Sequence, residues 1–247
     1  MLPRFYVPDV HAGASTAALP VDEARHLTRV LRLVPGDEIA IFDGRGHEFR
    51  ARVAAAARDS VHVEVLEPLV PATEARVPVT LAQAVLKGDR MDAVIRDATM
   101  MGVAAIDPII TARTIGPLHS IESGRAVERW SRVAVSSAKQ CRRATVPAIG
   151  NGRSLKEWLA VRSPGLRLIF VEPSASAGTD QSLHLLVPRA PAALSLLVGP
   201  EGGWTAEERQ LAEADGCIAV TLGALTLRAD AVAVAAIAMT RFAMNDL

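Results

Sequence analysis

The chain has 247 residues, half of them apolar, which is enough for one large domain or two modest ones with a real core. Its formal charge is zero, so the total charge does not indicate nucleic acid, and its two distant cysteines lack metal-ligand spacing. No apolar run reaches transmembrane length and no signal-peptide core begins the chain, so we expect a cytoplasmic protein with neither membrane nor metal partner.

Charge is distributed unevenly along this neutral chain. Between Arg125 and Arg167 there are ten basic residues against two acidic ones, whereas residues 197–247 carry seven acidic and three basic residues. A basic central segment fits a localised surface that binds a polyanion. A solvated helix surface explains the same pattern equally well.

The first seventy residues favour short strands. Strands are expected at residues 4–7, 38–42, 47–53 and 60–66. Asp43-Gly44-Arg45-Gly46 predicts a hairpin turn. A helix at 21–33 would bury one face formed by Ala24, Leu27, Val30 and Leu31. Several short strands with one helix predict a small closed or half-closed β-barrel.

Three prolines within residues 67–78 predict a linker, and the pattern changes beyond it. Strands are expected at 79–86, 104–110, 167–172, 194–199 and 217–222. Helices are expected at 89–101, 125–142, 154–162, 205–214 and 229–243. This alternation predicts an α/β domain with a mainly parallel sheet that has helices on both faces.

Two glycine-containing loops carry the most information. The apolar run 194–198 ends in Gly199-Pro200-Glu201-Gly202-Gly203, and the run 217–222 ends in a loop that contains Gly223. We expect both loops to open at the same edge of one sheet, where glycines let main-chain groups touch a planar ligand. A tight turn that merely caps a strand is the alternative for the first loop. The chain has no G-x-G-x-x-G after its first strand, which disfavours a nicotinamide oxidoreductase.

Three polar clusters are candidate RNA contacts. The helix that ends near residue 143 concentrates Gln140, Arg142 and Arg143, although cations are favoured at a helix carboxyl terminus by its dipole. Lys87 and Arg90 follow a strand, and the Asp89 between them also fits an N-cap. The third cluster lies on the first helix and contains His26, Arg29 and Arg32, where a solvated face explains the residues equally well.

At these residues the chain resembles a known family. Gly199-Pro200-Glu201-Gly202-Gly203, followed by Leu222-Gly223 and Leu227-Arg228, resembles the SPOUT methyltransferases. More narrowly, it resembles the RsmE-type enzymes, which methylate N3 of a uridine in small-subunit (16S) ribosomal RNA. Further short motifs fall in the family's order: Arg4-Phe5-Tyr6-Val7, His26-Leu27, Phe42-Asp43-Gly44, Lys87-Gly88-Asp89-Arg90, Arg129-Trp130, Gln140 with Arg143, and Val146-Pro147.

The resemblance implies a fold and a set of partners. Residues 1–72 would form a PUA-like β-barrel RNA-binding domain, and residues 73–247 a SPOUT domain with a carboxyl-terminal trefoil knot. The cofactor would be S-adenosyl-L-methionine, the substrate ribosomal RNA or the small ribosomal subunit, and the protein a homodimer. N3 lies on the pairing edge, so the target base must be unpaired or flipped out.

The resemblance also implies roles for individual residues. Cofactor contacts are expected from Glu172, Pro173, Val198, Gly199, Pro200, Glu201, Gly202, Gly203, Leu222, Gly223, Leu225, Leu227 and Arg228. RNA contacts are expected from Arg4, His26, Arg29, Arg32, Lys87, Arg90, Gln140, Arg142 and Arg143. The catalytic candidates are Arg228, which would stabilise the anion on O2 and O4, and Asp230, which would orient Arg228 or accept the proton through water.

The chain departs from the family pattern at a few positions. Met100-Met101-Gly102 stands where members have Glu-Leu-Gly, and Leu225, Asp230 and Ala231 replace Arg, Glu and Thr. Two other functions stay open. One is a SPOUT enzyme that methylates a ribose 2′-hydroxyl, and the other is a non-catalytic RNA-binding assembly factor, which the three replacements support to some extent.

Overall fold

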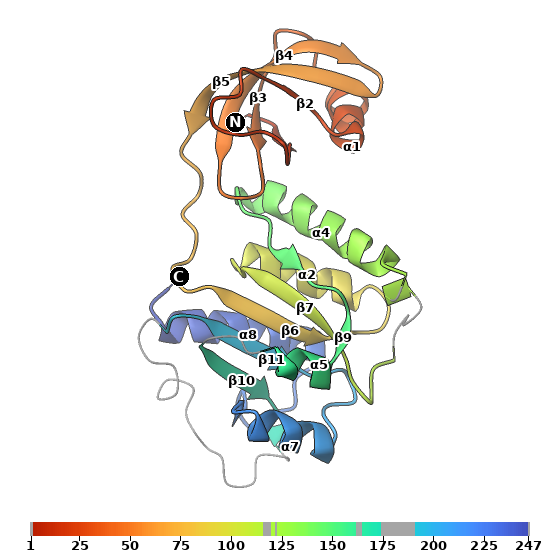
Figure 1. Ribbon diagram of the computed structural model, residues 1–247, viewed down its shortest axis with the longest axis vertical. Coiled ribbons are helices and arrows are strands. Elements are labelled where there is room, and N and C mark those ends of the chain that lie inside the picture. The colour runs from red at the N-terminus through yellow and green to blue at the C-terminus, as the bar shows by residue number, and fades with distance from the viewer. Residues whose placement is uncertain (1, 116–119, 122, 162–164, 174–190, 247) are drawn as a thin grey trace. The chain divides into compact units, whose positions relative to one another are not determined.

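The computed structural model describes residues 2–115, 120–121, 123–161, 165–173 and 191–246 (Figure 1). It divides into two compact units, residues 1–74 with 135–146 and residues 75–134 with 147–247. The amino-terminal unit begins with β1 (Arg4–Tyr6), β2 (Thr16–Ala18), α1 (Val21–Arg25), the π-helix η1 (His26–Leu31), β3 (Glu38–Phe42), β4 (Glu48–Ala57) and β5 (Ser60–Leu69). Helix α4 (Arg125–Cys141) has residues in both units.

The carboxyl-terminal unit has the predicted alternation of strands and helices. Its elements are β6 (Val79–Ala84), α2 (Arg90–Met100), β7 (Ala105–Ile110), β8 (Ala148–Ile149), β9 (Arg153–Ser154), α5 (Leu155–Ala160), β10 (Leu166–Phe170), β11 (Leu194–Val198), α7 (Ala206–Ala214), β12 (Ile218–Val220) and α8 (Ala229–Ala243). The five long strands and five helices expected from the sequence are all present, with ends that differ by a few residues at most. The short strands β8 and β9 were not expected, because two residues carry no periodicity.

A five-stranded, mostly antiparallel sheet forms the amino-terminal unit. Its order is β1-β3-β4-β5-β2, and only β1 and β3 run parallel. Alternate residues of these strands, such as Phe5, Ile39 and Val63, are fully buried in one core. The hairpin between β3 and β4 forms as predicted, because Asp43 Oδ1 accepts hydrogen bonds from the amides of Arg45 (2.7 Å) and His47 (3.0 Å).

The first helix differs from its prediction. It is α-helical only over α1 and then widens into the π-helix η1, which ends at Arg32 in the left-handed region (φ 54°). A π-helix has more residues per turn, so the 3.6-residue pattern loses its phase. Ala24 and Leu27 are buried as expected, whereas Val30 and Leu31 are 64% and 40% exposed. The prediction of one face that buries all four was therefore wrong.

The predicted linker is shorter than expected. Strand β5 continues to Leu69, and Pro68 pairs with Phe49 of β4. Proline has no amide proton, so it is disfavoured in a strand that is paired on both sides. On its second side, however, β5 pairs with β2 only at residues 62–64. Pro68 therefore lies where one side of β5 is free of a described partner strand, and the extended connection runs from Val70 to Pro78.

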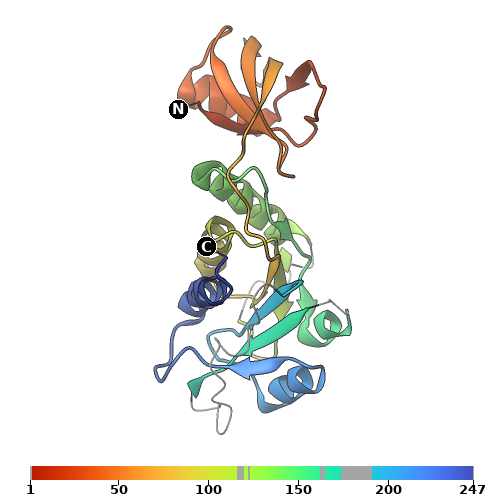
Figure 2. The same cartoon turned by 90° about the vertical axis from the view of Figure 1, so that its left-hand side faces the viewer.

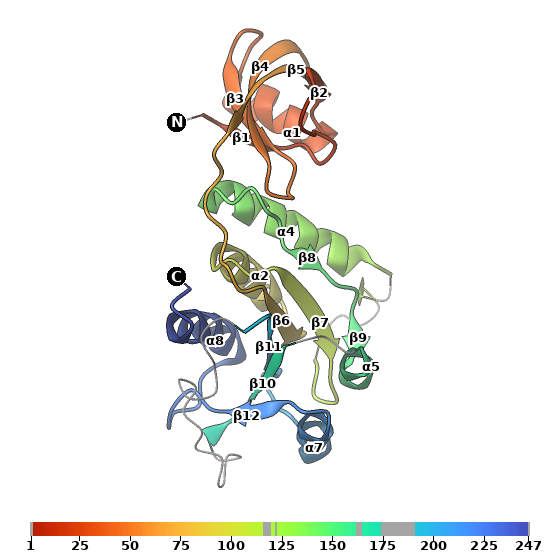
Figure 3. The same cartoon turned by 60° about the vertical axis from the view of Figure 1, so that its left-hand side comes forward.

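The carboxyl-terminal unit is built on a parallel sheet of order β12-β10-β11-β6-β7-β8, with β9 also paired to β7. Every pairing described in it is parallel. Helices α2 and α8 pack together on one face, and α5 and α7 lie on the other (Figures 1 and 3). The view in Figure 2 shows the same two layers edge-on. Within the described residues, no helix is both long and apolar enough to cross a bilayer.

The end of α8 is fixed by a buried ion pair. The Arg241 guanidinium donates to the carbonyls of Met101 (2.8 Å) and Gly102 (2.7 Å) and to the Asp246 carboxylate (2.9 Å). Asp246 also accepts from the amides of Arg76 (2.9 Å) and Val77 (3.0 Å) at the entrance to β6. Burial raises the pKa of Asp246, but these amides and the Arg241 charge outweigh it and hold the pKa below its ordinary value.

We predict that Asp246→Asn destabilises the carboxyl-terminal unit by about 3–5 kcal/mol at pH 7, because it removes the carboxylate from the buried ion pair with Arg241. The pKa of Asp246 is lowered on folding, so its contribution is complete above about pH 4, the unfolded pKa, and is lost as the pH falls further. Urea unfolding followed by circular dichroism between neutral and acidic pH measures both effects.

The matched control is Asp97→Asn, which removes the partner of Arg96 in an exposed pair. Exposed pairs contribute about 0–1 kcal/mol, so this variant should unfold close to the wild type. Equal unfolding curves for the Asp246 and Asp97 variants would contradict the assigned role of the buried pair.

Candidate active site

The strand register of the parallel sheet brings four loops to one edge. Phe170 of β10 pairs with Val198 of β11 and with Val220 of β12, and Val198 pairs with Gln83 of β6. These strands end level, so the described residues that directly follow them lie side by side. The predicted common edge for the two glycine loops is confirmed, with β10 between their strands.

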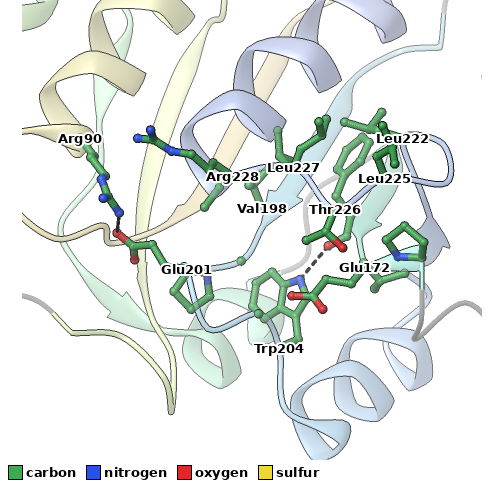
Figure 4. Close-up of a pocket in the computed structure, with 18 residues that line it drawn as sticks. Arg90, Glu172, Val198, Glu201, Trp204, Leu222, Leu225, Thr226, Leu227 and Arg228 are labelled. Carbon is green, nitrogen blue, oxygen red and sulfur yellow. Dashed lines mark hydrogen bonds and ion pairs between the residues drawn. The ribbon is translucent and has the colours of Figure 1, made fainter.

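A cavity of about 410 Å³ opens at this edge (Figure 4). It is lined by Arg90, Phe170, Val171, Glu172, Pro173, Val198, Gly199, Pro200, Glu201, Gly203, Trp204, Leu222, Leu225, Thr226, Leu227, Arg228, Ala229 and Val232. Most of these side chains are apolar, with two carboxylates and two guanidinium groups among them. This volume and lining are typical of a site for a small organic ligand.

The first glycine loop is held by its own tryptophan. Trp204 Nε1 donates to the carbonyl of Phe170 (2.9 Å), and its ring fills the space beside Gly199. A Cβ on Gly199 would lie 3.1 Å from Trp204 Nε1. Thr205 then begins α7 with a capping box, in which Thr205 Oγ1 accepts from the amide of Glu208 (3.2 Å). Gly199 is therefore required by packing within the loop.

At two further positions of this loop, contacts within the protein also favour glycine. Gly203 has φ +68°, and a Cβ there would lie 3.0 Å from a carboxylate oxygen of Glu172. A Cβ on Gly202 would lie 3.3 Å from the side chain of Arg113, whose Nη1 donates to the Gly202 carbonyl (2.7 Å). The sequence predicts glycines here because they give a ligand direct access to the main chain. Contacts within the protein are a second reason for glycine at these positions.

The second loop, residues 221–228, presents a different surface. Gly223 has φ +98°, and a Cβ there would meet nothing within 4 Å, so its conformation rather than crowding selects glycine. Leu225 and Leu227 are 79% and 40% exposed and line the cavity. Two large apolar side chains held in solvent at a cavity wall are suited to cover a flat apolar ligand.

Arg228 links this second loop to α8. It is the N-cap residue of α8 and lines the cavity. Its Nε donates to Asp230 Oδ1 (3.1 Å) and its Nη2 to Asp230 Oδ2 (2.8 Å), a two-pronged pair that fixes the plane of the guanidinium. Asp230 is therefore placed to orient Arg228, as expected from the sequence.

Arg90, which is expected to contact RNA, also reaches the first glycine loop. Its Nη1 donates to Glu201 Oε1 (3.0 Å), and the amide of Lys87 donates to the same oxygen (3.2 Å). Figure 4 shows Arg90 and Glu201 at one end of the cavity and Glu172, Leu222 and Leu225 at the other. The cavity thus has a charged end and a largely apolar end with one carboxylate.

Eleven of the thirteen residues expected to contact the cofactor line this cavity. Gly202 faces Arg113 instead, and Gly223 lies outside the lining. Arg90, which the sequence assigns to RNA, also lines the cavity. The lining residues that sequence reasoning missed are Phe170, Val171, Trp204, Thr226, Ala229 and Val232. Most of them directly adjoin an expected residue, and Val232 follows Arg228 by one helical turn. That adjacency is the signal that could have found them.

Two of the residues expected to contact RNA are buried by intramolecular partners. The Arg4 side chain is 7% exposed and forks onto Glu48 (2.8 and 3.1 Å), and it also donates to carbonyls at the end of α4. Arg143 is 8% exposed and pairs with Glu74 (2.7 Å). We therefore correct their assignment: both guanidinium groups hold parts of the amino-terminal unit together. The motif alone does not distinguish a buried arginine from an exposed one.

The remaining RNA candidates lie on the surface of the two units. His26, Arg29, Arg32, Gln140 and Arg142 are exposed in the amino-terminal unit, while Lys87 and Arg90 belong to the carboxyl-terminal unit. Arg29 pairs with Asp59 (3.2 Å). Arg142 follows α4 with φ +70°, which turns the chain sharply at that point. These side chains stay candidates for RNA contact.

Comparisons with known proteins identify the family. The model of an RNA methyltransferase domain matches residues 73–241, and that of an RNA methyltransferase PUA domain matches residues 19–66. The chain belongs to this family of RNA methyltransferases. The resemblance found in the sequence is thereby confirmed, together with the PUA-like and α/β parts of the predicted fold.

Individual relatives agree with this assignment. The ribosomal RNA small subunit methyltransferase E of Synechocystis is 34% identical over 215 residues, which are 87% of this chain and 69% of the relative. A crystal structure of the Neisseria gonorrhoeae methyltransferase of the same name, bound to S-adenosyl methionine, matches 98% of both chains with 32% identity and a TM-score of 0.86. A Legionella pneumophila structure in complex with this cofactor matches 98% of both chains with 27% identity and a TM-score of 0.87.

Proposed function

We propose that this protein transfers the methyl group of S-adenosyl-L-methionine to N3 of a specific uridine in small-subunit (16S) ribosomal RNA. The observation that carries the proposal is the cavity between the two glycine loops, in a chain that matches a cofactor-bound relative over 98% of its length. Residues 1–72 would bind RNA, and residues 73–247 would bind the cofactor and perform the transfer.

The residues at the cavity fit this cofactor. S-adenosyl-L-methionine carries a flat adenine, a sulfonium cation and an amino-acid end. Phe170, Leu222 and Leu225 offer an apolar wall, and the carboxylates of Glu172 and Glu201 oppose the cofactor's positive charge. Gly203 leaves room for the Glu172 carboxylate at the cavity wall, while its own amide donates to the carbonyl of Pro200 within the loop (2.9 Å). This fit supports the expected cofactor contacts as a group.

Methyl transfer requires positioning more than acid catalysis. When bound, the cofactor supplies an electrophilic methyl group: the S–CH₃ bond breaks with its electron pair left on sulfur, and a bond from N3 to the methyl carbon forms. Uracil N3 must lose its proton, and negative charge then spreads to O2 and O4. Arg228 is placed to stabilise that charge, because Asp230 fixes its guanidinium at the cavity. Asp230 or water would accept the proton.

We further propose the homodimer, the knot and the cytoplasmic location that the family resemblance implies. The surface of α8 supports a dimer, because Met239 and Phe242 are 46% and 76% exposed within two turns of the helix. Met100, at the end of α2, is 37% exposed, and α2 packs against α8. Exposed apolar clusters of this kind are typical of protein interfaces.

The direct test of the proposed reaction uses ribosomal RNA from a strain that lacks the gene. Treatment with protein and S-adenosyl-L-methionine should create one new stop in primer extension, because a methyl on N3 blocks base pairing. Mass spectrometry of the nucleosides should show 3-methyluridine. Detection of a 2′-O-methyl nucleoside instead would establish the ribose-directed reaction, and binding without any methylation would support a non-catalytic assembly factor.

Arg228→Ala should lower kcat by about 100–1000-fold, as loss of a charge-stabilising donor does in other active sites. The cofactor Kd should change little, because most of the cavity wall is unaltered. Single-turnover methylation and titration calorimetry measure the two quantities. A control variant, Arg209→Ala, removes a partly exposed arginine of α7 that does not line the cavity, and it should methylate normally. Wild-type turnover by Arg228→Ala would refute the assigned role.

Gly203→Ala should raise the cofactor Kd by at least about tenfold, or 1.4 kcal/mol. Its φ of +68° strains any side chain, and the new Cβ displaces the Glu172 carboxylate at the cavity wall. Gly216→Ala is the matched control, since Gly216 has φ +85° with nothing within 4 Å and does not line the cavity. Both variants should be less stable than the wild type, but only Gly203→Ala should bind the cofactor more weakly. Equal cofactor affinities of the two variants would contradict the assigned role of Gly203.

A further inference from the structure

The ion pair between Arg90 and Glu201 connects two loops with different expected partners. Glu201 belongs to the first glycine loop, whereas Arg90 begins α2 directly after the Lys87-Gly88-Asp89 turn. One carboxylate oxygen of Glu201 accepts from both the Lys87 amide (3.2 Å) and Arg90 Nη1 (3.0 Å) (Figure 4). The two loops follow neighbouring strands, so this oxygen is a hydrogen-bonded link between them at the cavity.

The pair is accessible enough to exchange partners. The side chains of Arg90 and Glu201 are 44% and 32% exposed, and both line the cavity. An exposed ion pair contributes about 0–1 kcal/mol, less than a two-pronged bond between arginine and phosphate in a complex. A phosphate of bound RNA can therefore draw Arg90 away from Glu201 at small cost.

Movement of Arg90 away from Glu201 would change the charge at the cavity. Two carboxylates, Glu172 and Glu201, and two guanidinium groups, Arg90 and Arg228, line the cavity. Arg228 is paired with Asp230, so Arg90 is the guanidinium group that offsets Glu201. When Arg90 turns to phosphate, Glu201 is left without that cation and the cavity becomes more negative. The methyl donor has a net positive charge, whereas the product S-adenosyl-homocysteine is neutral. Without Arg90 beside it, the Glu201 carboxylate therefore strengthens binding of the donor relative to binding of the product.

We propose that Glu201 is a positioning residue that couples RNA binding to selection of the charged methyl donor, through its exchangeable pair with Arg90. This inference rests on the proposed function. Because coupling between two ligands is reciprocal, the donor must also strengthen RNA binding by the same factor. The consequence is that an RNA-bound enzyme holds the donor and releases the neutral product.

Equilibrium dialysis tests the coupling with two probes that cannot react. Sinefungin keeps the positive charge of the donor, and S-adenosyl-homocysteine is neutral. Unmethylated small-subunit ribosomal RNA from a strain that lacks the gene should tighten sinefungin binding to the wild type about fivefold or more and leave the neutral probe nearly unchanged. Equal effects on both probes would overturn the proposal.

Two variants separate coupling from simple support of the loop. Arg90→Gln should bind sinefungin more tightly than the wild type without RNA, and RNA should add little. Glu201→Gln should bind it no more tightly than the wild type, and RNA should again add little. If the ion pair only supports the loop, both variants should bind sinefungin more weakly than the wild type. That result would refute the inference.

Arg96→Gln provides the control, because Arg96 is another exposed arginine of α2 whose partner, Asp97, lies on the same helix. It should keep the full effect of RNA on sinefungin binding. The proposed function fails separately from this inference: it fails when the wild type binds neither probe or does not methylate the RNA. Methylation with no RNA-dependent preference for the charged probe would overturn the coupling alone.

Discussion

The parallel register of β12, β10, β11 and β6 is the constraint on which the candidate site depends. Because these strands end level, four connecting loops meet at one edge of the sheet, although they are far apart in the sequence. Hydrogen bonds then hold the loops in place: Trp204 donates to the last residue of β10, and Glu201 accepts from Arg90 at the start of α2. The cavity is a product of this convergence rather than of any single motif.

Much of the architecture could be predicted because long periodic segments specify their own structure. Helix α8 begins and ends where the apolar pattern predicts, and the alternation after residue 78 requires a parallel sheet. Three features could not be predicted, for physical reasons. The π-helix changes the helical period inside a short segment, Arg4 and Arg143 are buried by partners distant in sequence, and the pairing of Arg90 with Glu201 depends on strand order.

The departures from the family pattern are compatible with an organised cavity. Asp230 is one methylene shorter than the usual glutamate, yet both of its oxygens reach Arg228. Met101 contacts Arg241 through its main-chain carbonyl, which accepts a hydrogen bond from Arg241 Nε. This contact does not depend on the identity of the side chain at position 101. Leu225 replaces a cation with an exposed apolar wall. Of the replaced positions only Leu225 lines the cavity, so the cavity wall itself loses one positive charge.

The proposed reaction requires above all that the two glycine loops together hold the methyl donor at the edge of the sheet. A crystal structure of this protein with S-adenosyl-L-methionine tests this requirement most directly. We expect density for the whole cofactor between residues 199–203 and 222–228, with Arg228 beside the sulfonium methyl group. Ordered cofactor bound elsewhere, with both loops empty, would contradict it.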